Sequence, residues 1–204
     1  MPNHRGEDRR VRRTKGQLRH AITSLIHEKP YDAIAVKEIL TRADVGRTAF
    51  YTHFRDKDEL LGSAFREALR AGSPRPAARS IAADDVARLL LRFSLPLFER
   101  IVHVRQTGHS LETVTRSDEI HGRLRAVLEE HLRDDLRDMP RLSGDRRAPA
   151  DVELLVRHVA GTFLLVLEWW AEHGDARSAR ELDARFRALV EPALDTALSA
   201  PPGR

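Results

Sequence analysis

The stretch VGRTAFYTHF, residues 45–54, concentrates side chains that can bind phosphate groups and the edges of nucleic-acid bases. It holds three aromatic residues, although aromatics make up only 5% of the chain. An arginine can donate two parallel hydrogen bonds to a guanine edge, and hydroxyl groups can bind phosphate oxygens. These residue types favour a nucleic-acid contact if one element presents the polar groups together.

A helix over residues 47–54 would present them in that way. At 100° per residue, Phe50 and Phe54 share one face with Ala49, and the polar side chains of the segment point away from it. So short a helix is not stable alone, so neighbouring helices must anchor its phenylalanines. We therefore expect the two phenylalanines to be buried and Tyr51 to be exposed.

The segment before it completes a helix-turn-helix pattern. Residues 36–43 (VKEILTRA) predict a helix, and Asp44 tolerates the left-handed backbone that the following turn needs. Gly46 can begin the second helix, which in such units enters the major groove. We expect base contacts from Arg47 and Thr48. The whole set of expected DNA-contacting residues is Arg47, Thr48, Tyr51, Thr52, His53, Lys57, Lys37, Arg12, Arg13 and Lys15.

The remaining elements are also predicted to be helices. A first helix starts near Thr14 and ends before Pro30, and Asp56 with Glu59 resembles a capping box for a fourth. Amphipathic stretches follow at 83–107, 117–138, 150–173 and 178–198, with Pro96 expected to kink the first and Pro192 to bend or interrupt the last. No segment alternates as a strand does, so the fold class is all-α.

Composition and charge limit the classes of protein. The chain has 204 residues and no cysteine, which excludes disulfides and thiolate metal sites. Residues 1–57 carry 13 Lys/Arg against 7 Asp/Glu, a basic head typical of nucleic-acid binders. The charged N-terminus lacks the core of a signal peptide, and the apolar run 159–171 is too short to span a bilayer. We expect a cytoplasmic, nucleoid-associated protein with no membrane partner.

The segment IAVKEILTRADVGRTAFYTHFRDKDELL, residues 34–61, resembles the DNA-binding signature of the TetR family of transcriptional regulators. The resemblance extends over about residues 14–65. It implies an N-terminal three-helix DNA-binding domain (1–70) and a C-terminal helical bundle (71–204), divided at AGSPRPAARS (71–80). It further implies a homodimeric repressor that binds double-stranded DNA at a palindromic operator and is released by a small-molecule inducer, with no cofactor.

The chain departs from the family pattern at three places. One is the turn, where the family usually has glycine and serine and this chain has Asp44 and Gly46. Ile34 and Ala35 stand where the family commonly has threonine or serine, which cap the second helix and touch phosphate. Arg47 and Thr48 stand where small residues are common. We expect Arg47 and the basic stretch 9–15 to compensate for the missing phosphate contacts, which predicts an unusual operator.

The C-terminal part has apolar helices suited to dimerisation and to ligand binding. A helix that is apolar all round must be buried on several sides. The residues assigned to the dimer interface are Val159, Phe163, Leu167, Leu182, Phe186, Leu189 and Val190. The residues assigned to a ligand pocket, for which a packed core is the alternative, are Phe93, Leu97, Phe98, Val102, His103, Leu124, Leu128 and Trp170.

Enzymatic and metal-binding functions have little support in the sequence. The segment EEHLRDD, residues 129–135, has no HExxH element, and the chain has neither a glycine-rich phosphate loop nor a nucleophile elbow. We therefore expect no enzyme and no resident metal. Two alternatives stay open: a metal-sensing regulator, and a helical protein-interaction adaptor that does not bind DNA.

Overall fold

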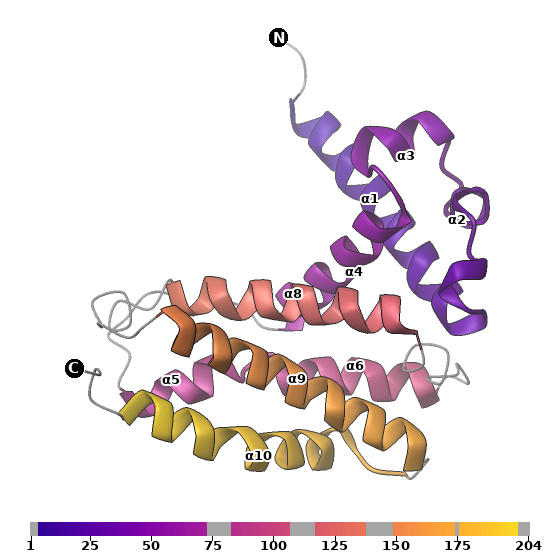
Figure 1. The fold of residues 1–204 in the computed structure, drawn as a ribbon. Helices are drawn as coiled ribbons and strands as arrows, with labels where there is room; N and C mark the ends of the chain where they lie inside the picture. The colour runs from indigo at the N-terminus through magenta and orange to yellow at the C-terminus, as the bar shows by residue number, and fades with distance from the viewer. Residues whose placement is uncertain (1–3, 73–82, 107–116, 138–148, 174–175, 200–204) are drawn as a thin grey trace. The chain divides into compact units, whose positions relative to one another are not determined.

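The computed structural model describes residues 4–72, 83–106, 117–137, 149–173 and 176–199. Every regular element within these ranges is a helix, which confirms the all-α prediction (Figure 1). In chain order the elements are α1 (His4–Glu28), the 3-10 helix η1 (Tyr31–Ala33), α2 (Val36–Ala43), α3 (Arg47–His53), α4 (Lys57–Gly72), α5 (Ala83–Leu90), α6 (Ser94–Gln106), α8 (Asp118–Arg137), α9 (Pro149–His173) and α10 (Ala179–Ser199).

The chain forms two compact units. Unit 1 comprises residues 1–67 and 109–123, and unit 2 comprises residues 68–108 and 124–204. Helix α8 therefore gives its first turns to unit 1 and its remainder to unit 2. Most of the segment expected to divide the domains, residues 73–80, lies outside the described residues.

Unit 1 is built on the apolar stripe of α1. Leu18, Ile22, Leu25 and Ile26 are all almost fully buried, as their helical spacing predicts. The other members of this continuous core come from α1 itself and from the remaining elements of the unit. These are Ala21, Tyr31, Ile34, Ile39, Ala43, Phe50, Phe54, Leu60, Leu61, Ala64 and Ile120.

Helix α1 begins ten residues earlier than its apolar stripe predicts, at His4 instead of Thr14. Arginine and glutamate have high helix propensity, so this charged segment can extend a helix that the core already stabilises. Arg12 also donates a 2.8 Å hydrogen bond to Asp8, four residues earlier on the exposed surface. The basic residues before Thr14 are therefore helical.

The core of unit 2 is an aromatic cluster. Phe93, Phe98, Phe163 and Phe186 are at most 1% exposed. The rings of Phe98 and Phe163 stack with centroids 4.6 Å apart, and the rings of Phe163 and Phe186 meet edge to face at 5.6 Å. Side chains from α6, α9 and α10 thus fill this interior.

The effects of the two prolines on their helices are as follows: Pro96 differs from its predicted kink, and Pro192 does not interrupt its helix. The expected single helix over 83–107 is two helices, α5 and α6, separated at residues 91–93. Pro96 lies in the first turn of α6, where the missing N–H costs little, and its ring excludes a helical carbonyl at residue 92. Pro192 lies inside α10, which continues through it without interruption.

Residues 151–173 of helix α9 are apolar enough, and the helix is long enough, to cross a membrane by length and composition. Half of its most apolar window is buried inside the protein. Phe163, Leu164 and Leu167 are at most 1% exposed. Helix α9 is therefore a core helix of unit 2.

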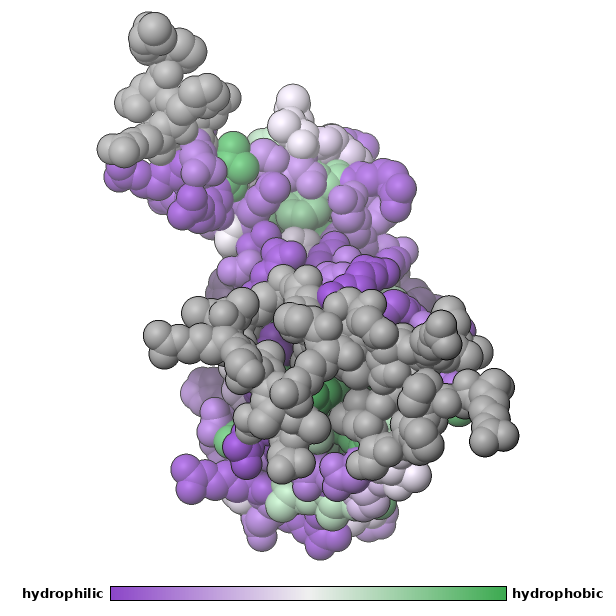
Figure 2. All heavy atoms as spheres, turned by 90° about the vertical axis from the view of Figure 1, so that its left-hand side faces the viewer, coloured by the Kyte–Doolittle hydropathy of each residue, from purple (hydrophilic) through white to green (hydrophobic). Residues whose placement is uncertain are grey.

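On the face shown in Figure 2, hydrophilic residues cover most of the described surface and hydrophobic ones form small patches.

Candidate nucleic-acid interface

The turn between α2 and α3 sets the direction of the candidate reading helix. Asp44 has φ 51°. Within the described residues it is the one non-glycine residue whose φ is positive. The N–H of Val45 donates to the carbonyl of Leu40 at 3.1 Å, which closes the end of α2. Gly46 follows with φ −69° and begins α3. The left-handed position falls at Asp44, as the sequence predicts.

Helix α3 has one buried and one exposed side. Phe50 and Phe54 are 0% and 4% exposed, with ring centroids 6.0 Å apart. Tyr51 is 49% exposed and meets the edge of the Phe50 ring at 5.1 Å. The guanidinium carbon of Arg47 lies 5.6 Å from the centre of the Tyr51 ring. The cation–π contact gives two long exposed side chains a common orientation.

The threonines and the histidine of α3 extend this exposed side. Thr48 and Thr52 are exposed, and the Thr52 hydroxyl donates to the Thr48 carbonyl at 2.9 Å, which leaves its oxygen lone pairs accessible. His53 is half-buried. Burial, and then the positive charge of Lys15 on α1, lower the pKa of His53 below its usual value. Lys15 on α1 thus lies near enough to His53 on α3 for its charge to act on the imidazole.

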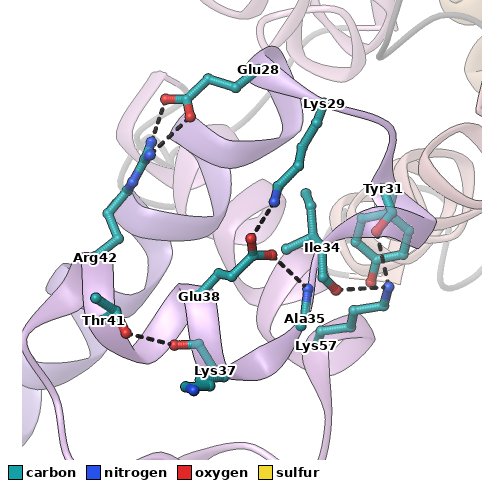
Figure 3. A network of polar contacts seen from close by, with 10 residues as sticks. All are labelled: Glu28, Lys29, Tyr31, Ile34, Ala35, Lys37, Glu38, Thr41, Arg42 and Lys57. Carbon is teal, nitrogen blue, oxygen red and sulfur yellow. Dashed lines mark hydrogen bonds and ion pairs between the residues drawn. The ribbon is translucent and has the colours of Figure 1, made fainter.

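The start of α2 is held by a carboxylate instead of a hydroxyl cap. Ala35 precedes the helix with an extended backbone and provides no side-chain acceptor. The Glu38 carboxylate instead accepts the Ala35 N–H at 3.0 Å and also pairs with Lys29 (Figure 3). The hydrogen bond from Lys29 and the one from Ala35 lower the pKa of Glu38. Glu38 thus performs half of a capping box.

Lys57, an expected phosphate contact, is held within unit 1 in the free chain. Its ammonium group donates to the carbonyls of Tyr31 and Ile34 at 2.9 and 3.2 Å (Figure 3). Two of its three N–H donors are therefore already used. Lys57 lies at the start of α4 and its aliphatic stem is half-buried. The ammonium group therefore reaches the carbonyls of the segment that precedes α2. Lys57 fastens η1 and α2 to α4.

The start of α4 is capped as the sequence predicts. The Asp56 carboxylate accepts the N–H of Glu59 at 2.7 Å. Glu59 reaches back one residue further than a capping box requires and accepts the N–H of Arg55 at 2.8 Å. The bond from Glu59 lowers the pKa of Asp56. The loop between α3 and α4 is thereby fixed at both ends.

The other expected DNA contacts lie on the outside of unit 1. Lys37 is exposed on α2. Arg12 and Arg13 are exposed on α1, where Arg12 pairs with Asp8. These three basic groups are therefore accessible to a phosphate backbone, although Arg12 must first leave a carboxylate.

The structure separates the expected ligand-pocket residues into two groups. His103 is exposed on α6 and does not share the interior. The buried members of the set are Phe93, Leu97, Phe98, Val102, Leu124, Leu128 and Trp170. Phe93 and Phe98 each pack against the rings of Phe163 and Phe186, so these two belong to the aromatic core of unit 2.

The expected dimer residues are mostly buried within a single chain. Leu189 is 54% exposed. The others are at most 2% exposed and belong to the core of unit 2: Val159, Phe163, Leu167, Leu182, Phe186 and Val190. The apolar residues exposed on α9 are instead Leu154 and Leu165, at 69% and 57%. Sequence periodicity cannot distinguish two apolar faces of a helix that is apolar all round.

Sequence reasoning missed the polar contacts behind the reading helix. The Tyr31 hydroxyl donates to the carboxylate of Asp58, 27 residues later. Burial, followed by this bond, raises the pKa of the Tyr31 phenol far above its usual value. No periodic signal joins such distant residues, and the pairing of Lys29 with Glu38 crosses the turn at Pro30 in the same unpredictable way. Among the described residues, no three His, Asp or Glu side chains gather as a metal site.

Comparison with known proteins agrees with this geometry. Residues 18–64 match the family model of the bacterial regulatory proteins of the tetR family. The transposon Tn10 TetC protein of Escherichia coli is 32% identical over 69 residues, which cover 34% of this chain and 35% of that protein. The uncharacterized HTH-type transcriptional regulator YxbF of Bacillus subtilis is 38% identical over 55 residues, or 26% of this chain and 14% of that protein. The chain thus spans about a third or less of the length of these curated relatives.

A solved structure matches over a longer range. The crystal structure of a TetR transcriptional regulator from Streptococcus agalactiae 2603V covers 92% of this chain and 99% of its own, with a TM-score of 0.53 and 21% identity. At this identity the match concerns the fold, which is shared across both units. Residues 18–64 are thus similar to the bacterial regulatory proteins of the tetR family, and the chain as a whole shares the fold of this solved regulator.

Proposed function

We propose that the chain is a sequence-specific DNA-binding transcriptional regulator, and that it represses from an inverted-repeat operator. Helix α3 would lie in the major groove, with Arg47 and Thr48 on base edges. Tyr51, Thr52 and His53 would contact the phosphate backbone, together with Lys37 and the basic face of α1. Such a protein acts in the cytoplasm on the nucleoid.

The observation that carries this proposal is the division of α3 into two sides. Its phenylalanines are buried in the core of unit 1, while Arg47 and Tyr51 lie stacked and exposed on the other side. A helix held rigidly from behind can present base-reading side chains at a fixed angle. An adaptor that had lost DNA binding would have no need to keep an exposed arginine, tyrosine and two threonines on so short a helix.

We further propose that two copies associate through the exposed apolar residues of α9 and α10. Leu154 and Leu165 lie on one side of α9 with Gly161 between them, because residues 7 and 11 apart share a helix face. A Cβ atom at Gly161 would meet no atom within 4 Å, so a helix of the second copy can approach closely. Leu189 on α10 is exposed, so of the residues assigned to the interface from the sequence it is the one that we keep there. Two-fold symmetry of the dimer then matches an inverted-repeat site.

Release by a small molecule is part of the same proposal, and it rests on the family resemblance. An inducer that entered the interior of unit 2 would have to take space that Phe93, Phe98 and Phe163 now fill. It would therefore act by favouring a conformation in which these rings separate, a shift in population instead of direct competition with DNA.

Selection from a random duplex library tests the proposed function. The purified protein should enrich one motif that is an inverted repeat, with half-sites separated by about one helical turn or slightly more. A library that shows no enriched motif after repeated selection would contradict sequence-specific binding. An enriched motif without two-fold symmetry would contradict the proposed dimer but would still support sequence-specific binding.

A further inference from the structure

The first turns of α8 are part of the core of unit 1. Ile120 is 0% exposed and belongs to the same apolar cluster as Leu18, Phe50 and Leu61. The side chain of Ile120 contributes to the stability of unit 1 like a fully buried residue of α1 or α4, because its burial removes all of its apolar surface from water. Unit 1 is therefore completed by a segment of α8 that begins at Asp118, well beyond the end of α4 at Gly72.

The contact between α8 and α4 is close because α4 has a glycine there. A Cβ atom at Gly62 would lie 3.3 Å from Cδ of Arg123, so the arginine stem crosses α4 where a side chain is missing. Gly62 is buried in the middle of α4, where a glycine weakens the helix. The close approach of Arg123 gives this glycine a role.

Arg123 continues into the contacts that hold α2. Its guanidinium lies 3.5 Å from one carboxylate oxygen of Asp58, and the other oxygen of Asp58 accepts the Tyr31 hydroxyl. The carbonyl of Tyr31 accepts Lys57, which also binds the carbonyl of Ile34, directly before α2. One chain of hydrogen bonds and ion pairs thus leads from α8 to the start of α2.

We propose that residues 118–123 of α8 position α2, and through it the reading helix α3, within unit 1. Ile120 anchors this segment in the core, and Arg123 orients Asp58 so that Tyr31 and Lys57 hold the entry to α2. Arg123 and Ile120 are positioning residues that need not touch DNA. The role in DNA reading rests on the proposed function, whereas the packing does not.

The test is hydrogen exchange of the free full-length protein, measured on the amides of residues 35–43. Gly62→Leu improves the helix propensity of α4 but places its side chain where Arg123 lies, and should speed this exchange about tenfold through loss of packing. Gly16→Leu is the matched control, since a Cβ at Gly16 on α1 meets no atom within 4 Å. It should leave exchange in α2 unchanged or slower.

Arg123 is tested separately by charge. Arg123→Gln should speed exchange in α2 by about two- to fivefold, the range of a partly exposed ion pair. Arg123→Lys should restore most of the protection, which a purely steric role would not require. Exchange in α2 that is the same in Gly62→Leu, Gly16→Leu and wild type would overturn the inference. The exchange measurements need no DNA. They therefore test the role of α8 in packing even if selection from the duplex library finds no operator.

Discussion

The ammonium group of Lys57 lies 4.3 Å from the centre of the Tyr31 ring and donates a 2.9 Å hydrogen bond to the Tyr31 carbonyl. One lysine thereby holds both the side chain and the backbone of η1 against α4. Its second bond, to the Ile34 carbonyl, reaches the residue before the cap of α2. Lys57 thus stabilises the helix-turn-helix from within unit 1.

Lys57 and Lys37 should consequently respond in opposite ways to neutralisation. Lys57→Met removes two hydrogen bonds to buried carbonyls and should lower the free energy of unfolding by about 1–3 kcal/mol. Lys37→Met should leave stability unchanged but reduce the slope of log affinity against log salt by about 1. Chemical denaturation and DNA titrations at several salt concentrations measure both. A reduced salt slope in Lys57→Met, at unchanged stability, would restore Lys57 as a phosphate contact.

Ala35→Ser should stabilise unit 1. Ala35 is exposed, with φ −87° and ψ 147°, the backbone of a helix N-cap, but has no side-chain acceptor. A serine hydroxyl can accept the N–H of Lys37, or share that of Glu38, which now donates to the Ala35 carbonyl at 3.0 Å. Serine at an N-cap is worth about 1 kcal/mol over alanine. Thermal unfolding should show the gain, and Ala33→Ser, an exposed change in η1, is the control. An equal effect of both changes would exclude capping as the cause.

Binding to DNA should strengthen as the pH falls from about 8 to 6. Burial and Lys15 lower the pKa of His53 in the free protein. A phosphate beside the imidazole would favour its charged form and raise that pKa in the complex, so binding takes up a proton. Affinity therefore rises as the pH falls toward the two pKa values. His53→Gln should remove this pH dependence, and retention of the full dependence would contradict a phosphate contact by His53.

Gly161→Arg should convert the dimer into monomers. The change places a long charged side chain between Leu154 and Leu165, where the chain itself has free space, so the fold of the protomer should persist. Light scattering after gel filtration should give half the mass, with an unchanged helical circular dichroism spectrum. Glu99→Arg, exposed on α6, is the control. A dimer that survives Gly161→Arg would place the interface elsewhere.

The sequence predicted the elements that depend on local rules. The stripe from Leu18 to Ile26, the left-handed Asp44 and the cap at Asp56 all follow from spacing or from one residue's conformational preference. The contacts of Lys57 depend on where α4 meets η1, and this requires the tertiary structure. For the same reason the sequence could not show which face of α9 is covered by α6 and α10. It assigned Val159 and Phe163 to an interface, whereas they form the core.

The measurement that tests the central claim most directly compares wild type with Arg47→Ala on the selected duplex and on a scrambled one, by fluorescence anisotropy at two salt concentrations. Arg55→Ala, an exposed arginine beyond α3, is the control. If α3 reads bases, wild type and Arg55→Ala should prefer the selected duplex at both salts, and Arg47→Ala should lose about 1–3 kcal/mol of that preference. Weak, salt-dependent binding to the scrambled duplex should persist in all three. An unchanged preference in Arg47→Ala would contradict the assignment of Arg47 to a base edge, and equal binding of both duplexes by wild type would contradict sequence-specific recognition altogether.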